Sequence, residues 1–153
     1  MLTISTQEVI IRLLAAFVIS GLIGLEREYY RRPAGLRTNI MVGVGAALIT
    51  IVSAQAAYLF KDFAVDPTRI AAQIVIGIGF LGAGTILHKG SSAVIGLTTA
   101  ATLWVVAGLG IAIGFGFYIE AAVAAGLVFF TFLVLSKLVP VIRREKDKER
   151  EEE

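Results

Sequence analysis

The stretch Arg-Ile-Ala-Ala-Gln-Ile-Val-Ile-Gly-Ile-Gly-Phe-Leu-Gly-Ala-Gly-Thr-Ile-Leu, residues 69–87, decides the fold class of this chain. It carries no charge after its first residue, and it holds four glycines, Gly77, Gly79, Gly82 and Gly84. In water, each glycine would weaken a helix by roughly 1 kcal/mol relative to alanine. In a bilayer, glycines let neighbouring helix backbones approach closely. The stretch therefore predicts a membrane helix that is packed inside a bundle and does not face lipid.

Three of these glycines, Gly77, Gly79 and Gly82, also match the G-x-G-x-x-G pattern of dinucleotide-binding folds. That pattern requires a preceding strand and an acidic residue about 20 positions further on. The flanks here are continuously apolar, and the next acidic residue is Glu120. Close helix packing is therefore the preferred interpretation over a nucleotide site.

The composition indicates a membrane protein. The 153 residues are 57% hydrophobic with a mean hydropathy of +0.83, whereas soluble domains are nearer 45–50% apolar. The chain has no cysteine, which excludes disulfides and thiolate metal sites.

Five apolar segments are long enough to be helices. They are residues 8–25, 38–60, 70–87, 97–116 and 117–139. At about 1.5 Å per residue, the second reaches about 34 Å and can cross a bilayer with some tilt. We therefore predict an all-α membrane protein, with a five-transmembrane-helix bundle over residues 1–140 and a charged cytoplasmic tail over 141–153.

The fourth segment repeats small residues on one face. Gly108, Ala112 and Gly116 recur every four residues, and Gly110 with Gly114 forms a G-x-x-x-G pair, which is typical of close helix contacts in membranes. This face exceeds what one neighbouring helix needs, so a homo-oligomer is expected, most simply a two-fold dimer.

The basic residues predict the orientation. Five spans place the termini on opposite sides, and eleven of the fourteen Lys and Arg residues fall on the side of the loop 26–37 and the tail. Cytoplasmic segments collect Lys and Arg. The N-terminus is therefore expected outside and the C-terminus in the cytoplasm.

Four blocks of sequence carry a family resemblance. They are Gly-Leu-Ile-Gly-Leu-Glu-Arg-Glu (21–28), Arg-Pro-Ala-Gly-Leu-Arg-Thr-Asn (32–39), Asp-Pro-Thr-Arg-Ile-Ala-Ala-Gln-Ile-Val-Ile-Gly-Ile-Gly-Phe-Leu-Gly-Ala-Gly (66–84) and Gly-Leu-Thr-Thr-Ala-Ala-Thr-Leu-Trp-Val (96–105). In this order they resemble the MgtC/SapB family of bacterial inner-membrane proteins. Longer members carry a soluble C-terminal domain, so the chain is similar to a short form of the family.

The resemblance implies a multi-pass protein of the bacterial inner membrane with five helices and an outside N-terminus. It also implies a link to magnesium homeostasis. The well-studied members it points to are regulators that bind larger membrane complexes, with ATP synthase as one example. The expected partners are thus the lipid bilayer, further copies of the chain and such a complex, with no nucleic acid.

Polar residues at the ends of the predicted spans are the candidate functional residues. They are Glu26, Arg27, Arg37, Thr38, Asn39, Asp66, Arg69, Gln73, Thr98 and Thr99. The first five frame a cytoplasmic mouth that serves either as a partner surface or as headgroup anchors. Gln73 lies inside an apolar helix, where a buried amide needs a partner, and the Thr98–Thr99 pair is a candidate. The threonines can equally bond their own backbone.

Other chemistry finds little support in the sequence. His88 is the single histidine, so it has no second imidazole or thiolate with which to form a transition-metal site. No metal site, cofactor or set of nucleophile, base and orienting group is expected, and an enzyme is not predicted. Close helix packing is expected at Gly77, Gly79, Gly82, Gly84, Gly108 and Gly110.

Three functions remain open at this point. The first is a non-enzymatic regulator that docks on another membrane protein, and the second is a transporter or channel for magnesium or another small solute, formed by an oligomer. The third is a structural membrane scaffold. Magnesium prefers several oxygen ligands in octahedral geometry, and the predicted spans contain no pair of acidic residues, which favours the regulator.

Overall fold

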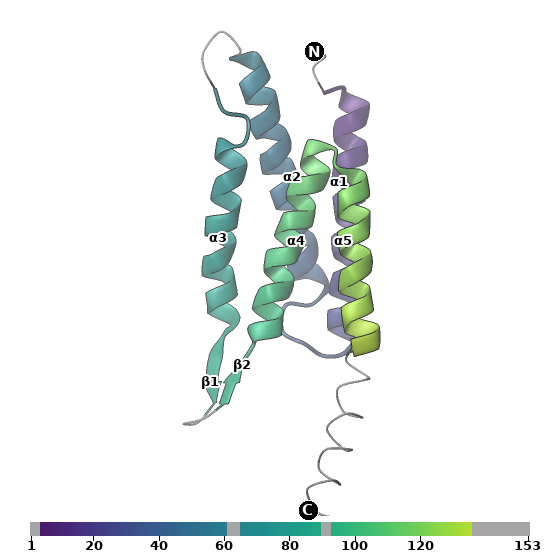
Figure 1. The fold of residues 1–153 in the computed structure, drawn as a ribbon, viewed down its shortest axis with the longest axis vertical. Coiled ribbons are helices and arrows are strands. Elements are labelled where there is room, and N and C mark those ends of the chain that lie inside the picture. The colour runs from purple at the N-terminus through teal and green to yellow at the C-terminus, as the bar shows by residue number, and fades with distance from the viewer. Residues whose placement is uncertain (1–3, 61–64, 90–92, 136–153) are drawn as a thin grey trace, which may run out of the picture. The chain divides into compact units, whose positions relative to one another are not determined.

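A computed structural model describes residues 4–60, 65–89 and 93–135. Contacts divide the chain into two compact units, residues 1–121 and 122–153. The elements are α1 (Thr6–Tyr29), α2 (Leu36–Leu59), α3 (Arg69–Thr85), β1 (Leu87–Lys89), β2 (Ala93–Ile95), α4 (Leu97–Phe115), α5 (Tyr118–Phe130) and a π-helical turn (Thr131–Leu135), as Figure 1 shows. Unit 2 contains most of α5 and the π-helical turn.

Among the described residues, three helices, α1, α2 and α4, are long and apolar enough to cross a membrane. The apolar helices α3 and α5 are shorter. The structure thus confirms the predicted helical fold with segments able to cross a membrane, and the five spans and their orientation stay predictions. The charged tail 141–153 lies outside the described residues.

Helix α1 runs four residues beyond its predicted end at residue 25. Ser5 begins it by accepting a 3.2 Å hydrogen bond from the backbone N–H of Glu8. The segment Glu26–Glu28, which we had assigned to a loop, is helical because Glu and Arg are strong helix formers. The connection to α2 turns through Arg31 and Ala34, which both have positive φ angles, 52° and 57°.

Helix α2 begins with an unusual cap. Its N-cap residue, Gly35, has no side chain to offer, and Oε2 of Glu28 accepts a 2.7 Å hydrogen bond from the backbone N–H of Leu36 instead. A side chain from the last turn of α1 therefore satisfies one of the free N–H groups that begin α2.

A β-hairpin follows α3, where we had predicted the end of a helix and a loop. Leu87 pairs with Ile95, and Lys89 pairs with Ala93, in an antiparallel register. Helix α3 ends at Thr85, and Gly96 closes the hairpin with a φ of +94°. A side chain at Gly96 would collide with the carbonyl oxygen of Thr85, so this position requires glycine.

The core of unit 1 lies among α1, α2 and α4. Small residues set the helix separation at three levels of α2. A Cβ atom added to Gly43 would lie 2.6 Å from Cβ of Ser20, and one added to Gly110 would lie 2.8 Å from Cβ of Ala46. One added to Gly114 would lie 2.6 Å from Cβ of Thr50. These three helices are therefore held at backbone contact, as small residues permit in membranes.

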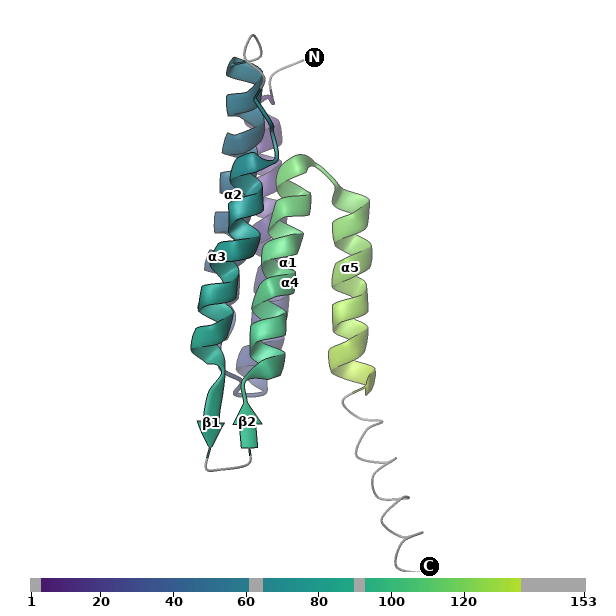
Figure 2. The ribbon, with the colours of Figure 1, turned by 60° about the vertical axis from the view of Figure 1, so that its left-hand side comes forward.

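Helix α3 packs on this core along one side only. Both ribbon views show it beside α4, with the hairpin continuing from its end (Figure 2). Ala71, Ile78 and Gly82 are its buried residues. Phe80 and Ile76 are 83% and 70% exposed.

The expected position of the α3 glycines is therefore wrong for the single chain. An added Cβ would meet no atom within 4 Å at Gly77, Gly79 or Gly84, nor at Gly108 of α4. At Gly82 it would make ordinary contact with Ala100, and only Gly110 of the six predicted glycines is tightly packed. Most of these glycines lie on the exposed sides of α3, because α3 packs against the core on one side only.

Candidate functional site

The predicted cytoplasmic mouth divides into internal and exposed residues. Glu26 and Arg27 form an ion pair, and their side chains are 9% and 8% exposed. Asn39 is fully buried, and its amide nitrogen donates to the carbonyl oxygens of Ala34 at 2.6 Å and Gly35 at 2.8 Å. Asn39 thereby holds the end of the loop against the start of α2.

Arg37 and Thr38 are exposed on the first turn of α2. Within the described part of the chain, neither side chain forms a hydrogen bond or an ion pair. Of the five residues predicted to form the mouth, these two are free to meet another molecule.

The start of α3 has no side-chain cap. Thr68, not Asp66, is the N-cap residue, and its side chain makes no capping bond. Asp66 Oδ1 instead accepts hydrogen bonds from the Thr68 hydroxyl at 2.7 Å and the Thr68 N–H at 2.8 Å. These bonds, with a smaller contribution from the charge of Arg69, lower the pKa of Asp66 below its ordinary value. Asp66 thus orders the turn before α3.

The expected bond between Gln73 and the Thr98–Thr99 pair is not formed. Gln73 is exposed and has no hydrogen bond to any described residue. Thr99 is buried at the α4 start, while the Thr98 carbonyl accepts a 2.8 Å bond from the Thr102 hydroxyl. Gln73 instead lies at one end of a groove that borders α3.

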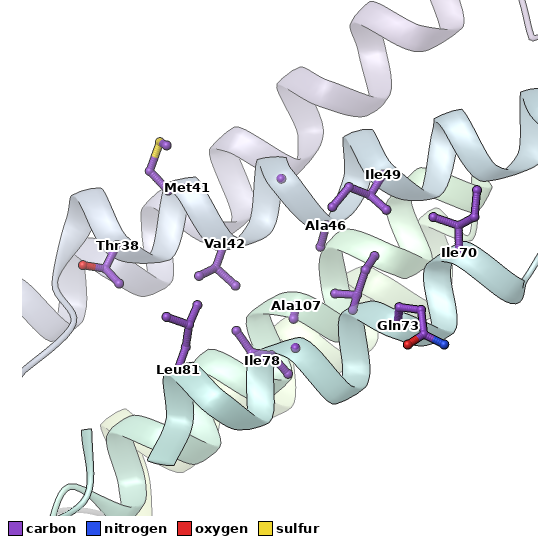
Figure 3. Close-up of a pocket in the computed structure, with 13 residues that line it drawn as sticks. Thr38, Met41, Val42, Ala46, Ile49, Ile70, Gln73, Ile78, Leu81 and Ala107 are labelled. Carbon is purple, nitrogen blue, oxygen red and sulfur yellow. The ribbon is translucent and has the colours of Figure 1, made fainter. Parts of the chain in front are cut away.

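An apolar groove runs between α2 and α3 and has a volume of about 590 Å³. Figure 3 shows Thr38 and Leu81 at one end and Ile49, Ile70 and Gln73 at the other. The lining residues are Thr38, Met41, Val42, Gly45, Ala46, Ile49, Ile70, Gln73, Ile74, Gly77, Ile78, Leu81 and Ala107. Sequence reasoning singled out Thr38, Gln73 and Gly77 but missed the groove, because uniformly apolar helices give no sign of where they separate.

A second polar site joins the start of α1 to the end of α4. Glu8 and Arg12 lie four residues apart in the sequence, a spacing that predicts a pair on one helix face, and Arg12 Nε does pair with Glu8 Oε1 at 3.0 Å. Arg12 also donates to the carbonyl oxygen of Gly114 at 2.7 Å, and the Tyr118 hydroxyl donates to Glu8 Oε1 at 2.7 Å. The partners at Gly114 and Tyr118 were not foreseen. One is a backbone atom, and both lie more than 100 residues from Arg12 and Glu8 in sequence.

Across the described residues, no group of three or more His, Asp, Glu or Cys side chains could hold a metal ion. The side chain of His88 is not among those described. Among the described residues, most of the side-chain hydrogen bonds from Ser and Thr hydroxyls go to backbone carbonyls, as at Ser20, Thr50 and Thr102.

Long apolar helices packed through glycine and alanine, with charges confined to their ends, define a helical membrane protein. The sequence narrows this class further. Residues 13–140 match the MgtC family, so the chain belongs to that family, as the sequence motifs had indicated.

Several relatives share most of this chain. It is 44% identical over 149 residues to Protein SapB of Bacillus subtilis, covering 92% of this chain and 63% of the relative. It is 48% identical over 130 residues to Protein MgtC of Brucella abortus, covering 85% and 52%. It is 48% identical over 119 residues to the putative magnesium transporter YhiD of Escherichia coli, covering 74% and 54%.

The chain thus spans about half to three-fifths of the length of these relatives. No solved structure matches it significantly.

Proposed function

We propose that this chain is a multi-pass protein of the bacterial inner membrane that acts as a non-enzymatic regulator. It docks through helix-to-helix contacts on a larger transport or energy-coupling complex linked to magnesium homeostasis, of which ATP synthase is one example. Five spans, an outside N-terminus and self-association of the chain, most simply as a two-fold dimer, belong to the same proposal.

The observation that carries the proposal is the outward side of α3. Ala72, Ile76, Gly79 and Ala83 recur at helical spacing on the side opposite the groove, and all four are exposed. An added Cβ at Gly79 would meet nothing within 4 Å. A partner helix could therefore approach the α3 backbone closely at Gly79 and Ala83, which lie one turn apart.

The hydrogen bonding of the buried hydroxyl groups supports docking over transport. Ser20, Thr50 and Thr102 each donate to the backbone carbonyl one turn earlier. Their hydroxyl donors are thereby used within their own helices. A dehydrated magnesium ion prefers several carboxylate and carbonyl oxygens in octahedral geometry, and the described residues contain no group of three or more acidic or histidine side chains that could hold one.

A second candidate is a transporter or channel for magnesium or another small solute, formed by an oligomer. Gln73 favours it, because an exposed amide without a partner on an apolar helix is available to a solute or to a second subunit. The name of the Escherichia coli relative points the same way.

One preparation can separate these functions. A photo-crosslinking residue placed at Ile76 should capture a larger membrane protein in cells, and Gly79→Leu should abolish that capture. Gly77→Leu, on the other side of α3, should leave it intact. The purified protein in liposomes should give no magnesium flux. Magnesium flux by the protein alone, or crosslinking to nothing but further copies of the chain, would overturn the proposal of a regulator.

A further inference from the structure

We propose that the groove between α2 and α3 binds an acyl chain of an anionic phospholipid whose phosphate is held by Arg37 at the start of α2. The proposal concerns a face of α3 different from the one that carries the proposed regulatory contact. It rests on the length, the lining and the charge of the groove.

The length of the groove matches one leaflet of a bilayer. Its lining extends from Thr38 to Ile49 on α2 and from Ile70 to Leu81 on α3, a separation of eleven residues along each helix. At 1.5 Å per residue this separation is about 16 Å, and half of a 30 Å hydrocarbon core is about 15 Å. The groove begins at the first turn of α2, where the headgroup region would lie. An acyl chain entering there would reach the bilayer centre.

The lining suits a hydrocarbon chain. Ala46 and Ala107 lie in its lining, and an added Cβ would meet no atom within 4 Å at Gly45 or Gly77. The side chain of Met41 is 74% exposed, so the groove opens outward. An unfilled apolar groove forfeits dispersion contacts, and the lipid around the protein supplies the molecules that fill it.

Positive charge is concentrated at one end of the groove. Arg37 lies one turn before Met41 on the same face of α2, and Arg31 and Arg32 are exposed in the preceding loop. None of the three arginines has an ion-pair partner among the described residues. The carboxylate of Glu28 also lies nearby, where its Oε2 accepts a hydrogen bond from the Leu36 N–H, so three basic groups stand against one acidic group here. A phosphate can accept paired hydrogen bonds from arginine.

The described residues at the opposite end carry less net charge. Among them, Arg69 is the basic residue near Ile70, and the carboxylate of Asp66 is close enough to Arg69 for its pKa to respond to that charge. The lipid headgroup is therefore expected at the Arg37 end. Gln73 lies at the far end of the groove (Figure 3), away from the proposed phosphate.

The test is lipid retention by the full chain. The protein would be placed in nanodiscs with equal phosphatidylglycerol and phosphatidylcholine, extracted mildly, and weighed by native mass spectrometry. Gly77→Leu adds a bulky side chain to the groove lining, at a position where an added Cβ would meet no atom within 4 Å, and Gly79→Leu is the same change on the other side of α3. Arg37→Gln removes the headgroup contact, and Arg69→Gln is its matched control. Thermal melting confirms that each variant is folded.

We expect the wild type, Gly79→Leu and Arg69→Gln to retain phosphatidylglycerol preferentially. Gly77→Leu should retain no bound lipid. Arg37→Gln should keep a lipid but lower the preference for phosphatidylglycerol about fivefold, as expected for one basic residue near an anionic surface. Equal retention of both lipids by the wild type, or unchanged retention in folded Gly77→Leu, would overturn the proposal. So would a lipid-free dimer that Gly77→Leu dissociates, because a second copy would then fill the groove.

Discussion

Arg12 donates from Nη1 to the backbone carbonyl oxygen of Gly114 across 2.7 Å, and thereby joins the start of α1 to the end of α4. The last carbonyls of a helix have no partner within the helix and carry partial negative charge. Arg12 satisfies one of them. Its Nε is held by Glu8, so the guanidinium is fixed from both sides.

Replacing Arg12 by Met should destabilise unit 1 by about 2 kcal/mol, because a charge-assisted hydrogen bond is lost and a carbonyl is left unpaired. Chemical unfolding in mild detergent would measure the change. Tyr118→Phe, which removes one hydrogen bond to Glu8, should cost about 1 kcal/mol. Equal stability of Arg12→Met and the wild type would show that the guanidinium does not hold the two helices.

Replacing Gly116 by Ala should also destabilise this end of α4. Gly116 has a φ of +88°, which costs an L-residue about 1–2 kcal/mol. The added Cβ would also lie 2.9 Å from Nη2 of Arg12. Combining this change with Arg12→Met should remove the steric part of the loss, and a double-mutant cycle of unfolding free energies would measure the coupling. Strict additivity would contradict the contact.

Two glycine substitutions of the same size should differ in their effect on stability. Gly110→Ala should cost about 1–3 kcal/mol, because the new methyl group overpacks a core contact with Ala46. Gly79→Ala should not destabilise the chain, since the position is open and alanine favours helix. Unfolding of both variants in the same detergent is the measurement. A large loss at Gly79 would show that a second chain already packs there.

Asp66 should make stability depend on pH at the acidic end. Its folded pKa is lowered, so its contribution is fully present above the unfolded pKa near 3.8 and is lost as pH falls through the folded value. The difference in melting temperature between the wild type and Thr68→Val should therefore shrink below about pH 4. A difference that stays constant down to pH 2 would contradict the assignment.

The absence of cysteine from the sequence gives a clean background for testing the proposed orientation. Single cysteines at Ser5 and Arg31 lie at opposite ends of α1. A membrane-impermeant thiol reagent applied to intact cells should modify Ser5→Cys and spare Arg31→Cys. Both should react after the membrane is opened. The reverse pattern would place the N-terminus in the cytoplasm.

Hydropathy and charge were enough to predict the helices and the family, because apolar length and motif order are properties of the sequence itself. They could not predict which face of α3 is covered. Glycines at Gly79 and Gly110 look alike in sequence, and only the arrangement of the neighbouring helices makes one open and the other tight. The hairpin was missed because Leu87 reads as the end of an apolar helix. Of the Arg12 site, the sequence predicts the pair with Glu8 but not the bond to Gly114, because that partner is a backbone atom.

The hydrogen bond from the Ser53 hydroxyl to the Pro67 carbonyl, 2.6 Å long, fixes the position of the start of α3 along the length of α2. It places that start beside a residue six positions before the end of α2. Helix α2 has 24 residues and α3 has 17, or about 36 Å against about 25 Å. A bilayer whose hydrocarbon thickness matches the length of α3 is thinner than one that matches α2. A mismatch between the two lengths costs a fraction of a kcal/mol per ångström. The groove between these helices therefore borders the side of unit 1 where the shorter α3 would favour a thinner bilayer than α2 does.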